Sequence, residues 1–330
     1  MQFSVLIATR NRPGLFERAI ASVLANRDAD FEVIVIDDGT EPPFREQLDR
    51  LEARLVAAES ERVRFHHLPH RERGHGPSYV LNYAASRARG DYLCFLDDDD
   101  LWIDTGYLAC ATAILACSPP SPDLLFFDQV AFAKGRRLSR AIWLEDLGCR
   151  LRAVAPPDQN GAYEVTVGQL LTAASFCHVN TTIVRRSFYG EVGGFDQAIR
   201  YEGDRDFYLR AIDRASLIKY VPRLVAQHNV PDAHAKRNVS TAVSETEKLR
   251  DRLTGLEKAA RDSRHVEIAS YAREHRIYTL KRLAFAAYAA NDLDQARTYA
   301  WRGLHIRFNI IWLFFTLYVS MRARSLKHFL

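Results

Sequence analysis

Short apolar runs alternate with amphipathic segments over the first hundred residues, and this alternation restricts the possible folds more than any other feature of the chain. The runs rich in β-branched or aromatic residues are Phe3–Ala8, Phe31–Ile36, Val63–Leu68 and Tyr92–Leu96. The segments with helical periodicity between them are residues 15–24, 44–58 and 78–89. Continuous apolar strands alternating with amphipathic helices indicate a parallel sheet covered on both faces. We therefore predict an α/β fold with a mostly parallel central sheet and flanking helices.

The chain changes character near residue 236. A further strand is predicted at Asp123–Phe132, residues 163–227 mix short helices and strands, and from about Ser240 the pattern is helical. Residues 236–330 hold 18 Lys and Arg against 9 Asp and Glu, whereas residues 1–235 hold 27 against 32. An acidic front and a basic tail indicate two regions with different tasks. We predict an α/β domain over 1–235 and a helical extension over 236–330.

Composition excludes several classes of protein. Hydrophobic residues make up 48% of the chain and charged residues 26%, unlike a disordered or collagen-like chain. The five cysteines are scattered and form no C-x-x-C pair, so neither a disulfide framework nor a zinc site is expected. The start of the chain lacks the pattern of a signal sequence, and the apolar run Phe308–Ser320 is shorter than the roughly 20 residues that a spanning helix needs. We predict a cytoplasmic protein.

Four consecutive aspartates, Asp97 to Asp100, directly follow the strand Tyr92–Leu96. Adjacent carboxylates repel one another, and their clustering at the edge of a core strand is costly unless a positive group binds there. Oxygen ligands at this density suit Mg²⁺ or Mn²⁺, which would also bridge the phosphates of a nucleotide. The alternative is a solvated acidic turn before a helix that Asp100 or Asp104 caps. That alternative explains one aspartate and not four.

Polar residues also follow the first two strands, and in open α/β sheets ligands bind beyond the carboxyl ends of the strands. After the first strand, Thr9 and Arg12 offer a hydroxyl and a guanidinium to a base edge and a diphosphate, unless this is a plain turn before a helix. After the second, Asp38 offers a carboxylate to a nucleobase or ribose, although Asp-Gly at 38–39 is also an ordinary turn.

A third group of polar residues lies in the segment from Gly193 to Arg210. It contains Gly-Gly-Phe-Asp at 193–196 and Glu-Gly-Asp-Arg-Asp at 202–206, where a helix is predicted from Arg205 to Arg214. A carboxylate at the head of a helix is usually an N-cap, which is one interpretation of Asp204. The other interpretation is a general base that removes a proton from an acceptor hydroxyl.

Together these segments resemble the family-2 inverting glycosyltransferases, which adopt the GT-A fold. The matching stretches are VLIATRNRPGLFERAIASVL, FEVIVIDDGT, GDYLCFLDDDDLW, GGFD and EGDRDFYLR, in the order that this family uses, over roughly residues 1–230. The resemblance implies a GT-A type, Rossmann-like sheet, a nucleoside-diphosphate sugar donor and an essential divalent metal, Mn²⁺ or Mg²⁺. It also implies sugar transfer with inversion at the anomeric carbon.

The resemblance also implies roles for individual residues. Carried over position by position, these are Ala8, Thr9, Arg12 and Asp38 along the nucleotide, Asp98 near the ribose, Asp97 and Asp99 for the metal, and Asp204 as the catalytic base. Members of this fold can place a histidine near the metal, which makes His228 a candidate ligand beside its structural alternative. His178 and Trp102 are candidates to face the acceptor sugar, with packing as the alternative for each.

Two departures from the family pattern bear on these roles. Residues 80–82 read Val-Leu-Asn where the family often has Ala-Arg-Asn, so an arginine contact from that position is lost. The acidic pair before the last helix is usually Glu-Asp, whereas this chain has Gly203 and Asp204. The base is therefore Asp204 or Asp206, with Asp204 the better match.

Residues 302–328 predict an interaction surface. Phe308–Ser320 is aromatic-rich and bracketed by arginines and a lysine, which suits a helix lying in the interface of an anionic membrane. A core helix or a contact between copies of the chain is the alternative, so a homo-oligomer stays open. Nucleic acid is not expected as a partner, because basic residues are mixed with acidic ones and no reader motif is present.

The sequence therefore predicts a metal-dependent inverting glycosyltransferase. Its acceptor would be a glycan or lipid-linked hydroxyl in the assembly of a cell-surface polysaccharide or other glycan. An inactive sugar-nucleotide-binding scaffold is one alternative, and the complete set of acidic residues disfavours it. A sugar nucleotidyltransferase is another, but it would need a Gly-rich loop after the first strand, where residues 10–13 read Arg-Asn-Arg-Pro.

Overall fold

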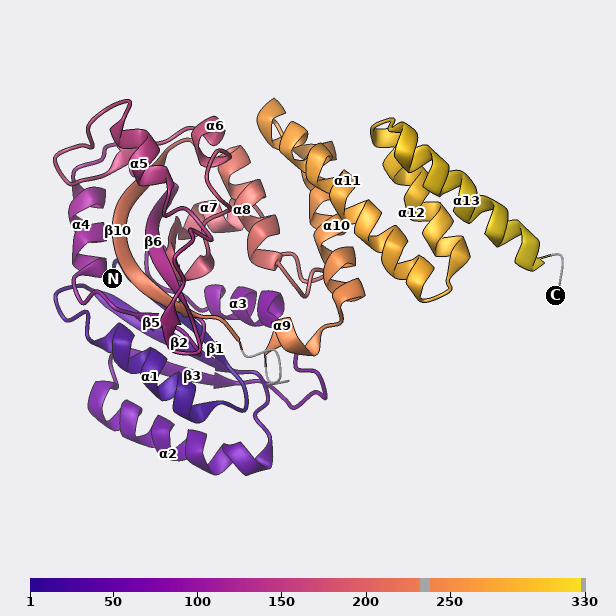
Figure 1. Ribbon diagram of the computed structural model, residues 1–330. Coiled ribbons are helices and arrows are strands. Elements are labelled where there is room, and N and C mark those ends of the chain that lie inside the picture. The colour runs from indigo at the N-terminus through magenta and orange to yellow at the C-terminus, as the bar shows by residue number, and fades with distance from the viewer. Residues whose placement is uncertain (232–237, 328–330) are drawn as a thin grey trace. The chain divides into compact units, whose positions relative to one another are not determined.

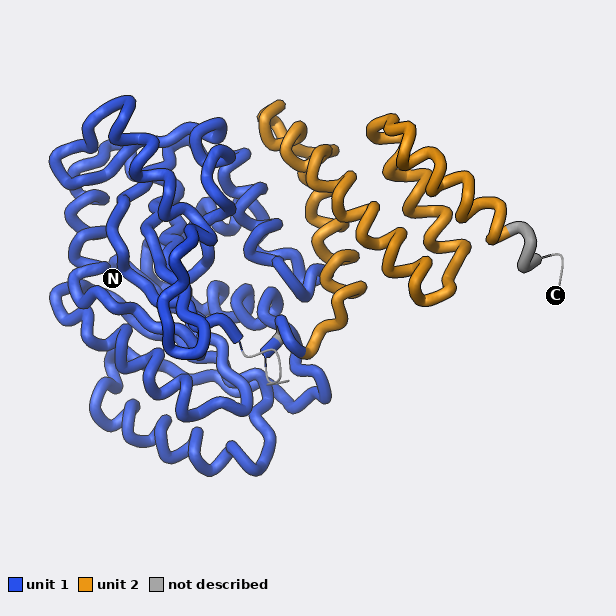
Figure 2. Tube along the Cα trace, viewed as in Figure 1, with its two compact units in different colours: residues 1–241 blue, residues 242–330 orange. Residues whose placement is uncertain are grey.

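The apolar runs of the sequence assemble into one twisted sheet in the computed structural model of the chain (Figure 1). The structure describes residues 1–231 and 238–327, with the backbone alone at residue 239 and residues 324–327. It divides into unit 1, Met1–Thr241, and unit 2, Ala242–Leu330 (Figure 2). The domain boundary predicted between residues 235 and 236 lies outside the described residues.

The sheet of unit 1 has ten strands among the described residues. In chain order they are β1 Phe3–Thr9, β2 Phe31–Asp37, β3 Val63–His67, β4 Tyr92–Phe95, β5 Leu101–Trp102, β6 Leu124–Ala133, β7 Arg136–Arg137, β8 Tyr163–Glu164, β9 Thr182–Arg185 and β10 Ile218–Asn229. The main order is β3-β2-β1-β4-β9-β6-β10-β5, with β7 on β6 and β8 on β10. The predicted α/β class with flanking helices is confirmed.

Strand direction explains how the polar motifs meet. β1 pairs in parallel with both β2 and β4, and β3 runs parallel to β2, so the carboxyl ends of these strands share one edge of the sheet. β9 is antiparallel to β4 and to β6, and β10 returns parallel to β6. β10 shifts register between Val221 and Ala226, where Pro222 cannot donate to the ladder. The long bent strand β10 thereby ends at the same edge (Figure 1).

Helices cover both faces of the sheet. Those of unit 1 are α1 Pro13–Leu24, α2 Pro42–Glu59, α3 Pro77–Ala85, α4 Tyr107–Ala116, α5 Leu147–Arg152, α6 Val167–Leu170, α7 Arg186–Glu191, α8 Gly203–Arg214 and α9 Val239–Ala242, with a 3₁₀ turn η1 at Val179–Thr181. Pro at the first or second position begins α1, α2 and α3, where its missing N–H costs nothing.

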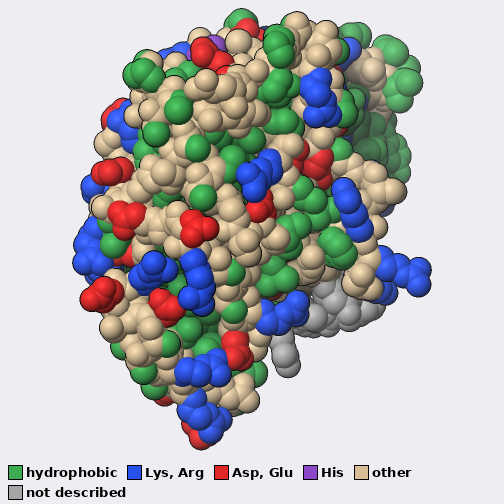
Figure 3. Space-filling model, turned by 90° about the vertical axis from the view of Figure 1, so that its left-hand side faces the viewer, with side chains coloured by type: hydrophobic (Ala, Val, Ile, Leu, Met, Phe, Trp, Pro, Cys, Tyr) green, Lys and Arg blue, Asp and Glu red, His purple; other side chains and the backbone are tan. Residues whose placement is uncertain are grey.

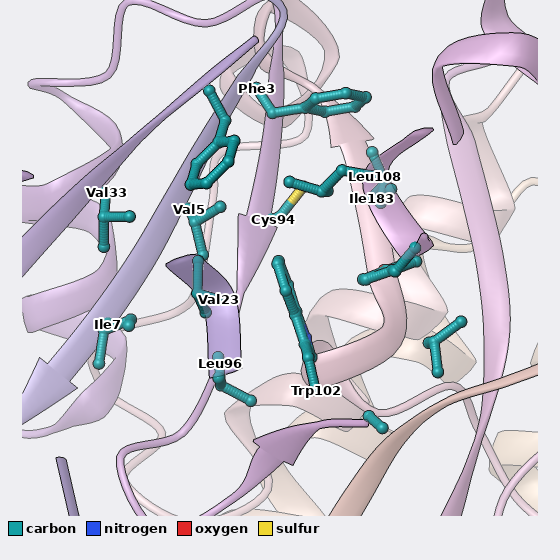
Figure 4. Packing of buried hydrophobic residues seen from close by; sticks show 14 of the residues in the cluster. Phe3, Val5, Ile7, Val23, Val33, Cys94, Leu96, Trp102, Leu108 and Ile183 are labelled. Atoms are coloured by element: carbon teal, nitrogen blue, oxygen red, sulfur yellow. The ribbon is translucent and has the colours of Figure 1, made fainter. Parts of the chain in front are cut away.

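Alternating side chains divide the core into two layers. Residues Phe3, Val5 and Ile7 of β1 pack with α1, α2 and α4 in one cluster, which also contains Cys94 and Trp102 (Figure 4). Successive strand residues point to opposite faces, so Leu6 belongs to the other layer. There α3 contacts β1 and β2. Each strand is buried on both faces, which explains why the runs in the sequence are continuously apolar.

Unit 2 is helical, as the pattern from Ser240 predicts. Its helices are α10 Glu245–Asp262, α11 Val266–Ala289, α12 Leu293–Ile306 and α13 Ile310–Lys327. Ser244 and Glu247 form a reciprocal capping box that begins α10. Leu280 and Leu283 of α11 pack against α10, while Trp312 of α13 packs against Ala300 and Leu304 of α12. None of the helices in the described part of the chain has an apolar stretch sufficient to span a bilayer.

Candidate active site

The short strand β5 brings the acidic segment beside the end of β10. Leu101 pairs with Gln227, and Trp102 pairs with Ala226. Asp100 therefore lies next to His228 and Asn229, which are far from it in the sequence. The expected helix does not begin at Asp100 or Asp104, because α4 begins only at Tyr107 without a side-chain cap. The capping alternative for both aspartates is wrong.

Asp100 is fully buried and bound on both oxygens. Its Oδ1 accepts the backbone N–H of Asn229 at 2.6 Å, and its Oδ2 accepts Asn180 Nδ2 at 2.5 Å and His228 Nδ1 at 2.7 Å. A carboxylate that holds the Nδ1–H of a histidine fixes the ring and leaves Nε2 as the available ligand atom. Asp100 thus orients His228.

The contact with Asp100 changes the pKa of His228. Burial lowers its pKa, but the hydrogen bond to Asp100 and the charges of Asp100 and Asp97 outweigh burial, so the net shift is upward. Its ring lies 5.0 Å from that of Trp143 and 5.2 Å from that of His178. Aromatic neighbours and a buried carboxylate therefore hold the imidazole in place.

His178 lies between two carboxylates of different origin. Its Nδ1 accepts the backbone N–H of Asn180, so a neutral ring carries its proton on Nε2. That Nε2 lies 3.8 Å from Asp97 Oδ2 and 3.7 Å from Asp204 Oδ2, beyond ordinary hydrogen-bond distance. Burial, then the neighbouring His228, lowers the pKa of His178 to about 3, which keeps the ring neutral.

Asp98 points into the protein, where it links two residues of the first motif. Only 1% of the residue is exposed; Thr9 Oγ1 donates to Oδ2 at 2.7 Å, and Arg12 Nη2 lies 2.5 Å from Oδ1. Burial raises the pKa of Asp98 to about 7 against the opposing charge of Arg12. Both oxygens of Asp98 are covered by Thr9 and Arg12 here, so the expected contact of Asp98 with a ribose stays a prediction. Asp98 positions Thr9 and Arg12.

Arg12 also reaches the neighbouring aspartate. Asp99 Oδ2 lies 3.1 Å from Arg12 Nη1 and accepts Asn238 Nδ2 at 2.7 Å. Arg12 Nη1 in turn donates to Asn238 Oδ1 at 3.2 Å. Burial lowers the pKa of Arg12, but the charges of Asp98, Asp99 and Asp97 outweigh burial. The net shift is upward, so the guanidinium stays charged. The structure thus brings together Thr9, Arg12 and the acidic segment, as the strand ends predict.

Asp97 is the most accessible of the four aspartates. Its side chain is 45% exposed, and its backbone N–H donates to Asn180 Oδ1 at 2.9 Å. Desolvation and the charges of Asp100 and Asp99 raise the pKa of Asp97 well above its ordinary value. An accessible carboxylate whose ionised form is destabilised by like charges is one that a bound cation would relieve.

The donor set therefore fits a divalent cation. Asp100, His178 and His228 each place a ligand atom within 4.8 Å of the others. Both oxygens of Asp100 already accept hydrogen bonds, and a neutral His178 carries a proton on Nε2, so His228 Nε2 is the imidazole nitrogen best able to bind a cation. The carboxylates of Asp97 and Asp99 are near enough to act on the charge of His228. Carboxylate oxygens with one imidazole suit Mn²⁺ and also Mg²⁺.

Asp204 lies in the first turn of α8 and does not cap it. The capping position is held by Glu202, with a left-handed φ of 58°, so the N-cap alternative for Asp204 is wrong. Burial, then the charge of Glu202, raises the pKa of Asp204 to about 6. Asp206 is buried, and Arg210 donates to its Oδ2 at 2.9 Å through Nε and contacts it at 2.7 Å through Nη2. Of the two candidate bases, Asp204 is the one beside His178 and the acidic segment.

The carboxylate of Asp38 is bound by the backbone and the side chain of His75. His75 donates its backbone N–H to the carboxylate at 2.9 Å, and His75 Nδ1 lies 2.6 Å from Oδ1. Gly74, with φ of +65°, allows this close approach, because a Cβ there would lie 2.4 Å from Asp38 Oδ2. Asp38 N donates to Thr9 O at 2.9 Å, which ties it to the carboxyl end of β1 beside the partly exposed Ala8.

Trp102 has no ring face to offer a sugar. It is 4% exposed and packs edge-on against Tyr107, with ring centroids 4.8 Å apart. Its indole N–H donates to the backbone carbonyl of Asn180 at 3.0 Å. The prediction of Trp102 as an acceptor residue is wrong, and the packing alternative holds. Figure 4 shows the indole within the core cluster.

The residues that sequence reasoning missed are mostly amides. Asn180 binds Asp97, Asp100 and, through its carbonyl, Trp102, and Asn229 donates its Nδ2 to the carbonyl of Asp99 at 2.6 Å. No spacing or charge pattern marks such residues. The one available signal is the position of Asn229 directly after the candidate ligand His228.

Comparisons with known proteins show which family the sequence resembles. Residues 4–112 match the model of the family Glycosyl transferase family 2. A PGL/p-HBAD biosynthesis glycosyltransferase of Mycobacterium bovis is 26% identical over 229 residues, which cover 69% of this chain and 76% of that protein.

Solved structures share the fold. Staphylococcus aureus TarS 1–349 in complex with UDP-GlcNAc aligns with a TM-score of 0.65 at 17% identity, over 93% of this chain and 81% of that one. Mannosyltransferase PcManGT from Pyrobaculum calidifontis, in complex with GDP-Man and Mn²⁺, aligns with a TM-score of 0.57 at 17% identity, over 97% and 84%.

Proposed function

We propose that this chain, a glycosyltransferase of family 2 with the GT-A fold, transfers a sugar from a nucleoside-diphosphate donor to a hydroxyl of a glycan or lipid-linked acceptor, with inversion. The observation that carries the proposal is the approach of Asp204 to the acidic segment. His178 Nε2 lies 3.7 Å from Asp204 Oδ2 and 3.8 Å from Asp97 Oδ2, and this proximity supports a base next to a cation site. Both parts of the reaction thus have residues at one edge of the sheet.

The donor class is supported by the residues at the ends of β1 and β2. Arg12 offers positive charge, and Ala8, Thr9 and Asp38 line the same edge. The solved relatives hold UDP-GlcNAc or GDP-Man, which supports a nucleoside-diphosphate sugar as the class of donor. Because His75 and Arg12 already bond to Asp38 and Asp98, we expect donor binding to exchange some of these contacts for contacts with the nucleotide.

Asp97, Asp99 and His228 would hold the divalent cation, Mn²⁺ or Mg²⁺. When bound, such an ion supplies positive charge that stabilises the diphosphate leaving group. Asp100 and Asn180 keep His228 and the backbone of Asp97 in place by the hydrogen bonds described above. The fit of this donor set and the Mn²⁺ in the mannosyltransferase support the assignment.

Asp204 would accept the proton of the acceptor hydroxyl. With a pKa raised to about 6, its carboxylate is ionised at neutral pH yet more basic than an ordinary aspartate. The Nε2–H of neutral His178 faces Asp204 and would orient that carboxylate as the hydroxyl attacks the anomeric carbon from the opposite side to the diphosphate. His178 is thus proposed as a positioning residue rather than as a contact for the acceptor ring.

The two units would have separate tasks. Unit 1 contains every residue assigned above, so we assign sugar transfer to it and propose that unit 2 places the enzyme near its acceptor. All five cysteines are free, which supports a reducing, cytoplasmic setting. The relative in PGL/p-HBAD biosynthesis supports a role in glycan assembly.

The test is a panel of UDP-, GDP- and dTDP-sugars with Mn²⁺, assayed for transfer and for donor hydrolysis by the purified chain. We expect turnover with one nucleotide class, loss of turnover in EDTA, and an anomeric proton in the product whose coupling constant reports inversion. Binding of a donor without any transfer or hydrolysis across the panel would favour the inactive scaffold instead.

A further inference from the structure

The outward face of α13 in unit 2 is almost entirely apolar. The large side chains exposed along it are Ile310, Ile311, Phe314, Leu317, Tyr318 and Met321. Their spacing of three and four residues places them on one stripe of the helix. A stripe of this kind normally faces a core, and here it is exposed, with Tyr318 at its edge also contacting Tyr288 of α11.

The opposite face of α13 is already packed. Trp312, Thr316 and Val319 are buried, and Trp312 Nε1 donates to the carbonyl of Ala300 at 2.9 Å. Gly303 of α12 makes room for that indole, since a Cβ there would lie 3.3 Å from Trp312 Nε1. The helix is therefore anchored in unit 2, and its apolar stripe cannot be buried by turning the helix around.

Neighbouring aromatic side chains widen the surface. Phe308 precedes α13 and is exposed, and Phe285 of α11 is exposed beside Phe315, at a ring separation of 4.8 Å. Folded chains rarely leave a contiguous apolar surface of this extent open to water unless it is a binding site. A partner therefore covers the stripe.

The charged residues of the segment that carries the stripe are of one sign. From Gln295 to Leu330 the sequence contains six Lys and Arg and no Asp or Glu. Arg307 and Arg322 are exposed at the two ends of the stripe. Arg302, part of the predicted basic flank, instead forms an ion pair with Glu257. The face drawn in Figure 3 differs, because acidic and basic side chains intermingle across it.

We infer that the α13 stripe lies in the interface of an anionic membrane, with its aromatic and aliphatic side chains among the lipid chains and Arg307 and Arg322 at the headgroups. Aromatic residues and arginines at the edge of an apolar helix face are typical of such interfacial helices. A second copy of the chain fits less well. A symmetric contact through this face would bring Arg307 and Arg322 of both copies together with no acidic residue of the same segment between them.

The test is co-sedimentation of the full chain with vesicles. Phosphatidylcholine vesicles are compared with vesicles that contain 30% phosphatidylglycerol, at low and at high salt. We expect binding to the anionic vesicles, at least tenfold weaker binding to the neutral ones, and weaker binding at high salt because the arginine contribution is screened. Equal binding to both vesicle types, or none, would overturn the proposal.

Matched substitutions locate the surface. Ile311→Glu changes a side chain that is 77% exposed on the stripe, and Val266→Glu changes one that is 76% exposed at the start of α11. We expect Ile311→Glu to weaken vesicle binding at least tenfold and Val266→Glu to leave it unchanged, with both variants keeping the wild-type circular dichroism spectrum. Equal effects of the two would contradict the assignment.

Light scattering without lipid addresses the rival partner. A monomer is expected for the wild-type chain and for Ile311→Glu alike. A wild-type dimer that Ile311→Glu dissociates would overturn the proposal and show that a second copy covers the stripe. Because this readout and vesicle binding require no turnover, they fail or succeed independently of the proposed sugar transfer.

Discussion

Unit 1 and unit 2 differ in the kind of side chain that they leave without a favourable environment. In unit 1, Asp98 is buried against Thr9 and Arg12, Asp100 is buried against Asn180, His228 and Asn229, and Asp97 remains as the accessible carboxylate. In unit 2, charged groups are dispersed over the surface, and apolar side chains of α13 remain in water. We propose a cation and a nucleotide as the ligands of the first arrangement and a lipid surface as the partner of the second.

The difference also separates the two kinds of test. Loss of a group in unit 1 should alter chemistry or ligand affinity without changing how the chain meets a membrane. Loss of a group on α13 should weaken membrane binding without changing the transfer of sugar to a soluble acceptor. Measuring both sugar transfer and vesicle binding for each variant is therefore the most direct test of this division between the units.

The largest effect is expected for Asp204→Asn. The amide keeps the size of the side chain but cannot accept the hydroxyl proton, and positioned bases contribute roughly 10²–10⁴ in rate. We expect kcat to fall by about that factor, with donor affinity within a few-fold of wild type by calorimetry and vesicle binding unchanged. Glu191→Gln, which alters an exposed carboxylate of the same unit, serves as the control. Normal turnover in Asp204→Asn would remove this residue from the mechanism.

A pair of tryptophan variants gives the next largest effect. Trp102→Ala removes a buried indole from the core of unit 1, and Trp312→Ala does the same in unit 2. Such truncations cost about 3–5 kcal/mol. We expect Trp102→Ala to lower the melting temperature and abolish transfer, and Trp312→Ala to abolish vesicle binding while a soluble acceptor is still glycosylated. Loss of soluble-acceptor transfer in Trp312→Ala would show that the units depend on each other for folding.

The strands of unit 1 are the part of the fold that the sequence predicts best. β1, β2 and β4 are predicted to within about one residue, because continuous apolar runs between Gly, Pro and Asp leave few alternatives. The end of α3 is misjudged, since residues 86–89 continue the polar and apolar pattern although the helix stops at Ala85. The backbone N–H of Arg89 instead donates to Glu32 of β2, a tertiary contact that no local pattern signals.

The site is predicted in the same uneven way. That Thr9, Arg12 and the four aspartates meet follows from the parallel order of β1 and β4. Which aspartate points inward depends on the two-residue strand β5 and its partner in β10, far along the chain. Trp102 lies on that strand, so its burial and the burial of Asp100 have one cause. The contacts of Asn180 with Asp97 and Asp100 also join residues far apart in the sequence.

A third prediction concerns Asp100, which is not assigned to the cation or the nucleotide but holds the proposed metal ligand His228. Asp100→Asn replaces one acceptor oxygen with a donor, so it cannot satisfy Asn229, Asn180 and His228 together. Loss of a group that orients a metal-binding histidine typically costs 10–100-fold in metal affinity. We expect titration calorimetry with Mn²⁺ and UDP or GDP to show a loss within about that range. Asp104→Asn, which disturbs the contacts with Arg223 and with the backbone N–H of Gly106, is the control and should bind as wild type.

The smallest effect is expected from pH, and here the two units should respond with opposite sign. The folded-state pKa of Asp98 is raised to about 7 and that of Asp204 to about 6, above the ordinary aspartate value. Between pH 7 and about 4 these two carboxyls therefore bind more protons in the folded unit 1 than in the unfolded chain, and their contribution to the free energy of unfolding rises as pH falls. In unit 2, the hydrogen bond from Lys248 lowers the pKa of Glu245, whose small contribution is lost as pH falls.

Calorimetric scans in EDTA at pH 7.5, 6 and 5 would measure both trends, with Asp98→Asn as the variant that removes part of the rise in unit 1. Catalysis should move against stability, because Asp204 loses its function as a base when it takes up a proton. We expect kcat to fall about tenfold per pH unit below pH 6 while unit 1 becomes harder to unfold. A parallel loss of activity and stability would mean that acid simply unfolds the site, and the assignment of Asp204 would lose this support.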